Sequence, residues 1–75
     1  MRAGLKFDYA KLKGRIKEKE LTQEEFSSLI GIGKTSLYSK FKNQTEFKQS
    51  EIMNAVKVLE IPKREINAYF FTPKV

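Results

Sequence analysis

The side chains best able to bind another molecule gather in the stretch LTQEEFSSLIGIGKTSLYSKF, residues 21–41. After the glycines, one cation and four hydroxyl groups stand between apolar positions: Lys34, Thr35, Ser36, Tyr38 and Ser39. No acid falls among them, although Glu24 and Glu25 occur in the preceding run. Short hydrogen-bonding groups and a cation are the types that contact base edges and phosphates, and an acid among them would repel phosphate. The pattern therefore predicts a surface that binds nucleic acid.

Catalytic chemistry is poorly supported by the composition. The chain has no cysteine and no histidine, and Asp8 is its single aspartate. Thiolate nucleophiles, disulfides and zinc–thiolate sites are excluded, and the usual general base is missing. Because catalysis would have to rest on Glu, Lys, Tyr or Ser alone, we expect no enzyme, no cofactor, no metal and no small-molecule substrate.

The size and charge of the chain fit a small binding domain. Its 75 residues predict one domain, and a chain of this length buries only roughly 60% of its unfolded surface. Fifteen Lys and Arg against nine Asp and Glu give +6, which favours a polyanionic partner. No apolar run approaches the roughly 18 residues of a membrane span, and MRAGLKF lacks the apolar stretch of a signal peptide. We expect a soluble cytoplasmic protein.

Apolar residues recur at helical spacing nearly throughout, and no segment alternates long enough to predict a strand. The first helix is expected over residues 8–19, with Asp8 as its N-cap and Leu5, Tyr9, Leu12 and Ile16 as its apolar positions. Thr22 and Glu25 form a capping box, which starts the second helix at residue 23. Gly31, in a position suited to positive φ, ends it.

Three further helices complete an all-α fold. The third opens at Gly33 or Lys34 and ends before residues 43–45. The fourth spans about residues 49–60, on the apolar set Ile52, Ala55, Val56 and Leu59. Pro62 suits the first turn of the fifth, whose apolar face is Ile66, Tyr69 and Phe70. Residues 71–75 form a short tail.

The second and third helices match a helix-turn-helix layout, in which two short helices cross steeply at a glycine turn. Apolar anchors are needed on both sides of that turn, and Phe26, Ile30, Ile32, Leu37 and Phe41 provide them. Small residues are needed where the helices touch, and Ser27 and Ser28 fit. The third helix would then project its other face into a DNA major groove.

The stretch LTQEEFSSLIGIGKTSLYSKFKN resembles the helix-turn-helix of the lambda-repressor-like superfamily, of the Cro and phage-repressor type. The resemblance continues through FKQSEIMNAVKVLEI and covers about residues 5–71, and the tail INAYFFTPKV is similar to that of small single-domain phage or prophage regulators. It implies a compact five-helix DNA-binding domain, operator recognition and usually a homodimer.

The resemblance also implies roles for particular residues. Gln23 matches a glutamine that contacts the DNA backbone. Lys34 and Thr35 match the first outward positions of the recognition helix, and Ser39 matches the next turn. Lys42 and Asn43 fall where the family places a phosphate-contacting segment.

The sequence departs from the family pattern at three positions. Ser27 replaces the usual alanine. Lys40 stands at a commonly apolar position, with Phe41 expected to take over its place in the core. Lys48 stands where a Ser or Thr cap is expected, so the start of the fourth helix is less defined.

Several of these residues also have ordinary structural interpretations. Gln23, Lys34 and Thr35 could be solvated helix residues, and Tyr38 could stack on a sugar or rest against the second helix. The basic residues of the first helix fall on several faces and are expected to be mostly solubilising. The aromatic run 69–71 could pack entirely on the core, or one exposed ring could mark a dimer interface.

The resulting prediction is a sequence-specific regulator of transcription that binds double-stranded DNA. A repressor or Cro-like homodimer would occupy a short inverted-repeat operator. The alternative is a protein-interaction module on the same fold, such as an anti-repressor or an antitoxin-like partner. The charge between residues 33 and 48 disfavours that alternative, because it amounts to +3 from one acid, Glu46, and four lysines: Lys34, Lys40, Lys42 and Lys48.

Overall fold

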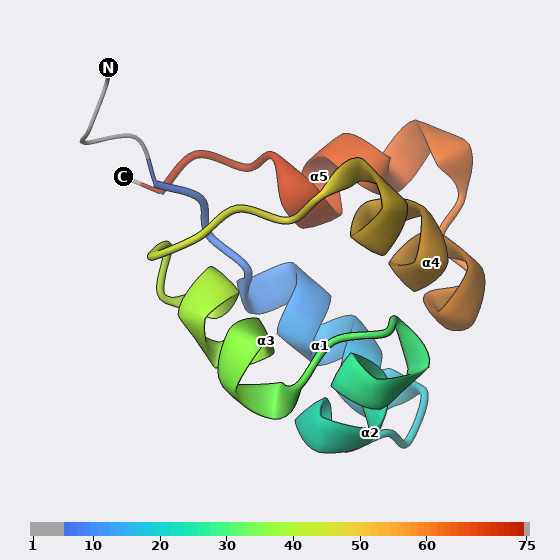
Figure 1. Cartoon of the computed structure of the whole chain (residues 1–75). Coiled ribbons are helices and arrows are strands. Elements are labelled where there is room, and N and C mark those ends of the chain that lie inside the picture. The colour runs from blue at the N-terminus through green and yellow to red at the C-terminus, as the bar shows by residue number, and fades with distance from the viewer. Residues whose placement is uncertain (1–5, 75) are drawn as a thin grey trace.

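The computed structural model describes residues 6–74, so Leu5 lies outside the described part. Five α-helices follow one another, with one 3₁₀ turn before the last: α1 Ala10–Glu18, α2 Gln23–Leu29, α3 Lys34–Phe41, α4 Gln49–Leu59, η1 Lys63–Glu65 and α5 Ile66–Phe70 (Figure 1). The predicted all-α fold is confirmed. Within residues 6–74, extended pairing is limited to one isolated antiparallel bridge between Phe7 and Pro73.

Helix α1 begins two residues later than expected. Its N-cap is Tyr9, and the carboxylate of Asp8 accepts a hydrogen bond from Ala10 N–H (2.9 Å). Asp8 stays outside the helix because its own N–H donates to the carbonyl of Thr72 (2.8 Å). The C-terminal tail therefore holds this segment extended.

Helix α2 has the predicted capping box at its start and the predicted glycine after its end. Thr22 Oγ1 accepts from Glu25 N–H (3.0 Å), and Glu25 Oε1 accepts from Thr22 N–H (2.8 Å), so α2 begins at residue 23. Gly31 has φ +86°, a left-handed conformation that favours glycine. Of the two serines expected at the helix contact, Ser27 is buried and donates to a backbone carbonyl, whereas Ser28 is exposed.

The N-terminus of α4 is capped by the side chain of a residue within the helix. Lys48 is the N-cap residue, and its N–H donates to Glu51 Oε1 (2.9 Å). The carboxylate of Glu51, the third helical residue, thus accepts from the N–H of the N-cap residue, a donor that a Ser or Thr side chain at the N-cap does not bind. At the other end, Glu60 takes the left-handed conformation (φ 54°) and ends the helix one residue before the expected limit.

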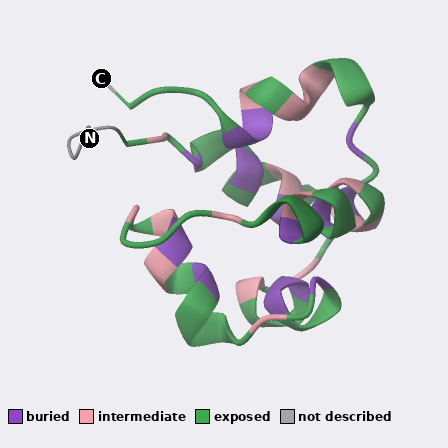
Figure 2. Ribbon diagram, turned by 45° about the horizontal axis from the view of Figure 1, so that its top comes forward, coloured by how far each residue is buried: buried purple, intermediate pink, exposed green. Residues whose placement is uncertain are grey.

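The core lies between the helices and contains most of the expected apolar positions. Helix α1 contacts α2 and α5, and α2 contacts α3 and α4. The buried apolar residues are Tyr9, Leu12, Ile16, Phe26, Ile30, Leu37, Ala55, Leu59, Ile61, Tyr69 and Phe70. Figure 2 shows exposed positions in the first turn of α3. Among residues 6–74, no helix has the length and apolar character needed to cross a membrane.

Candidate nucleic-acid interface

The outer face of α3 presents polar groups in a regular row. Thr35 and Lys42 are exposed and Ser39 is half-buried, while Leu37 is fully buried on the opposite side. Residues 35, 39 and 42 recur at i, i+4 and i+7, which places them on one side of a helix. We call Thr35, Ser39 and Lys42 the α3 stripe. Tyr38 lies beside it with 40% of its surface exposed.

Three further predicted contact residues lie outside this stripe, in the first turns of α2 and α3. Lys34, the first residue of α3, is exposed, and its Nζ lies 3.8 Å from Glu24 Oε1 on α2. Because both side chains are more than half exposed, this ion pair is weak and leaves the ammonium accessible. Gln23 is half-buried at the first position of α2, and Ser36 is exposed in the first turn of α3.

Asn43 has a structural task in this fold. It follows α3 in a left-handed conformation (φ 64°). Its Oδ1 accepts from Phe7 N–H (2.8 Å), and its Nδ2 donates to the carbonyl of Phe7 (3.0 Å). Both ends of the amide are therefore engaged, so Asn43 positions the N-terminal segment and is left out of the interface proposed below.

Lys40 requires a correction to the charge argument. Its side chain is buried, with Nζ 3.5 Å from Glu51 Oε1 and donating to the carbonyl of Glu46 (3.2 Å). Phe41 is only half-buried, so it does not simply replace Lys40 in the core. The +3 counted between residues 33 and 48 therefore overstates the charge available to a partner. The sequence did show a lysine at a commonly apolar position, but the acid that pairs with it, Glu51, lies on another helix, eleven residues further on.

The cations of α1 are engaged with the protein more than expected. Arg15 donates to the carbonyls of Leu59 (2.9 Å) and Glu60 (3.2 Å), which satisfies backbone acceptors at the end of α4. Lys19 hydrogen-bonds to the Glu60 carboxylate, and this bond together with the lysine charge lowers the pKa of Glu60. The ammonium groups of Lys11 and Lys13 each lie 5.1 Å from an aromatic ring centre.

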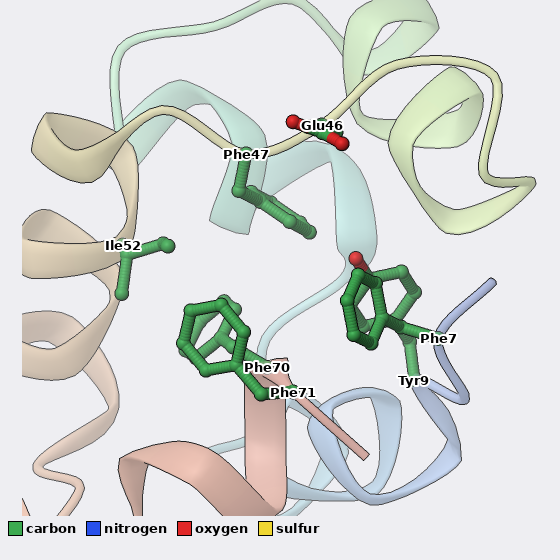
Figure 3. Close-up of a pocket in the computed structure, with 7 residues that line it drawn as sticks. All are labelled: Phe7, Tyr9, Glu46, Phe47, Ile52, Phe70 and Phe71. Atoms are coloured by element: carbon green, nitrogen blue, oxygen red, sulfur yellow. The ribbon is translucent and has the colours of Figure 1, made fainter. Parts of the chain in front are cut away.

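Aromatic rings line a pocket of about 190 Å³ (Figure 3). Its walls come from both terminal segments, the α3–α4 loop, α4 and α5: Phe7, Tyr9, Glu46, Phe47, Ile52, Phe70 and Phe71. The pocket is smaller than the roughly 300 Å³ typical of small-molecule sites. Burial, and secondly the nearby Glu46 carboxylate, raise the pKa of Tyr9.

The three aromatic residues at the end of the chain divide between core and surface. Tyr69 and Phe70 are buried, at 7% and 2% exposure, whereas Phe71 is 47% exposed. The sequence left open whether all three rings pack on the core or one stays exposed. The structure has the second arrangement, and Phe71 is the exposed ring. Phe71 also contacts the edge of the Phe7 ring, with ring centres 6.0 Å apart.

A family model described as "Protein of unknown function (DUF739)" matches residues 5–73, nearly the whole chain. The chain belongs to the DUF739 family. A search of curated proteins found no match.

This DUF739 protein is similar to the modulator of repression (MOR) of the temperate bacteriophage TP901-1 from Lactococcus lactis, known from a solution structure. The two chains are 37% identical, the match covers 87% of this chain and 88% of MOR, and the TM-score is 0.73. The match supports the all-α fold and agrees with the phage-regulator resemblance seen in the sequence. Membership of the lambda-repressor-like superfamily stays a prediction.

Proposed function

We propose that this protein is a phage-type regulator that binds double-stranded DNA through the outer face of α3. The observation that carries the proposal is the α3 stripe: Thr35 and Ser39 share one side of α3, and Lys42 continues this side directly after the helix. The order of α2, the Gly31 turn and α3 fits a helix-turn-helix layout. No acid occurs within Lys34–Phe41. Hydroxyl groups and a lysine on such a face can donate to base edges and phosphates in a major groove.

The neighbouring residues fit supporting roles in this arrangement. Lys34 and Thr35 lie at the N-terminal end of α3, which enters the groove first and reads bases. Gln23, at the start of α2, contacts the DNA backbone, and Lys42 contacts a phosphate at the far end of α3. Tyr38 and Ser36 flank the stripe within reach of sugar and phosphate groups.

We further propose that the protein binds as a homodimer on a short inverted repeat. One recognition helix contacts too few bases for useful specificity, and two-fold symmetry doubles the site. The exposed ring of Phe71, next to α5, is our candidate for the dimer surface. Sedimentation at micromolar concentration, with and without DNA, tests this: a monomer bound to one asymmetric site would contradict it.

The similarity to MOR supports a regulatory role in phage biology, because that protein is a modulator of repression. Regulation could act by occupying an operator, which excludes or recruits polymerase. A protein acting on DNA in this way works in the cytoplasm of its bacterial host and needs no cofactor.

Selection from a pool of random duplexes tests the DNA-binding proposal. We expect recovery of a palindromic site, whose binding falls with salt along a log–log slope on the order of −5 for about six phosphate contacts. The variant Thr35→Glu, which places an acid in the stripe at an exposed position, should lose this binding because the acid repels phosphate. Absence of binding to any duplex at low salt would overturn the proposal.

A protein-interaction module is the second candidate, and specific observations favour it. Leu29, at the end of α2, is 56% exposed, and Tyr38 on α3 is 40% exposed, so apolar surface adjoins the proposed interface. Burial of Lys40 also lowers the positive charge there. The two candidates separate through Leu29→Ser: docking on a protein would weaken strongly, whereas DNA binding would change little.

A further inference from the structure

Backbone hydrogen bonds join the two ends of the described chain. Asp8 N–H donates to the carbonyl of Thr72 (2.8 Å), and Lys74 N–H donates to the carbonyl of Lys6 (2.9 Å). These bonds flank the antiparallel bridge between Phe7 and Pro73. Figure 1 shows the two ends side by side, next to the loop that follows α3.

The paired ends are anchored to the end of α3. Asn43 binds both the N–H and the carbonyl of Phe7, and Asn43 directly follows Lys42. Lys6 precedes Phe7 and is paired with Lys74. Three lysines from three separate segments therefore lie in one neighbourhood, and all three are exposed: Lys6, Lys42 and Lys74. We call them the terminal lysine patch.

The pairing places two like charges opposite each other. In an antiparallel bridge centred on residues 7 and 73, residues 6 and 74 are direct partners, and direct partners project to the same face. The ring of Phe7 lines the aromatic pocket, so the lysine side chains project to the other side, towards solvent. Like charges in this arrangement destabilise a strand pair.

One acid shares this side of the bridge. Asp8 lies two residues from Lys6, and its Oδ1 accepts from Ala10 N–H. It therefore offsets part of one lysine charge, and the patch keeps an excess of positive charge. An anionic partner would relieve the remaining repulsion.

We infer that the terminal lysine patch binds DNA phosphates beyond the end of α3. This inference rests on the proposed function, since the duplex that accepts α3 supplies the phosphates. A helix of eight residues is only about 12 Å long, so contacts beyond its C-terminal end lengthen the footprint along the backbone. The residues that read bases and the residues that hold phosphate are thereby separated along one surface.

The experiment compares two double variants with the same loss of charge. Lys6→Gln/Lys74→Gln removes two cations from the patch. Lys57→Gln/Lys63→Gln is the matched control: both residues are exposed, and they lie at the end of α4 and in η1, away from the paired chain ends (Figure 1). Each variant is titrated with the duplex over a range of salt concentrations, and circular dichroism verifies folding.

Each phosphate contact contributes about 0.9 to the log–log salt slope, so the patch variant should lose about 1.8 per protomer bound while the control keeps the wild-type slope. The patch variant should also melt no lower than wild type, because a repulsion has been removed. If wild type binds and both variants show equal slopes, the inference is wrong and the proposed function stands. If wild type binds no duplex, both fail. Each variant is also titrated with poly-glutamate. If the patch variant binds the duplex like wild type but loses binding to poly-glutamate, the patch serves an acidic protein and the inference is overturned.

Discussion

Replacing Lys40 with methionine should strongly destabilise the fold, although Met is apolar and similar in length. The change leaves the Glu51 carboxylate buried without its cation, and the carbonyl of Glu46 loses a donor (3.2 Å). Breaking a buried ion pair by removing one partner costs about 3–5 kcal/mol. Both side chains keep roughly a tenth of their surface exposed (9% and 10%), so we expect the lower end, about 3 kcal/mol.

That loss is large for a chain of this size. At roughly 0.05–0.15 kcal/mol per residue, 75 residues give a free energy of unfolding of about 4–11 kcal/mol. A domain of 60–100 residues loses about 4–8 °C of Tm per kcal/mol, so Lys40→Met should melt about 12–24 °C below wild type. Thermal and urea unfolding followed by circular dichroism measure both quantities.

A double-mutant cycle identifies the cause. Glu51→Gln keeps a side-chain acceptor for Lys48 N–H but leaves the ammonium of Lys40 unpaired, so it should also cost about 3 kcal/mol. The double variant contains neither buried charge and should cost far less than the sum of the singles. Glu18→Gln, in an ion pair whose acid is 68% exposed, is the control and should stay within about 0.5 kcal/mol. A Lys40→Met variant as stable as wild type would refute the reasoning.

The remaining predictions concern the core, the interface and the aromatic cluster. Leu37→Ala should lower the free energy of unfolding by about 2–5 kcal/mol, measured by urea denaturation, and abolish DNA binding only through unfolding. Lys34→Ala or Thr35→Ala, still folded by circular dichroism, should weaken binding to the preferred duplex by about 1–3 kcal/mol and relax the preference at one base pair per half-site; unchanged preference would contradict the assignment. Lys42→Ala should instead weaken all duplexes alike and reduce the salt slope by about 1 for each phosphate that is no longer neutralised, which competition titrations detect. Because the fold raises the pKa of Tyr9 above its ordinary 10.0, the stabilisation by the neutral phenol is complete below pH 10 and is lost as pH rises through the folded-state pKa. Wild type should therefore lose stability relative to Tyr9→Phe above pH 10, and parallel melting curves that never diverge would contradict this.

Local signals in the sequence were sufficient for most of the helix boundaries. The Thr22–Glu25 capping box starts α2, because a capping box depends only on two residues three positions apart. Helix α3 begins at Lys34, directly after Gly33, as the sequence predicted. The apolar spacing of α4 likewise predicted its buried face. Such patterns need no knowledge of the remainder of the chain.

Contacts between distant segments could not be predicted from such local patterns. The ion pair that buries Lys40 joins α3 to α4, and the amide of Asn43 binds Phe7, 36 residues away. The delayed start of α1 depends on Thr72 in the tail. Each is a pairing of polar groups that folding brings together, and a single sequence does not mark its partners.

The candidate site divides in the same way. The sequence placed Lys34, Thr35 and Ser39 on the outer face of the third helix and Lys42 beside it as a phosphate contact. The structure places Thr35, Ser39 and Lys42 along one side, with Lys34 next to Glu24 of α2. Within the terminal lysine patch, Lys42 was predicted as a phosphate contact, but its proximity to Lys6 and Lys74 could not be predicted, because it exists only where the chain ends meet.

The most direct test of DNA binding by α3 is a titration of ¹⁵N-labelled protein with the selected duplex, followed by amide chemical shifts. We expect the largest shifts at Thr35, Ser39 and Lys42, with little change near Lys57 at the end of α4. Shifts that spare α3 and instead cluster around Phe71 and the aromatic pocket would contradict DNA binding by this helix.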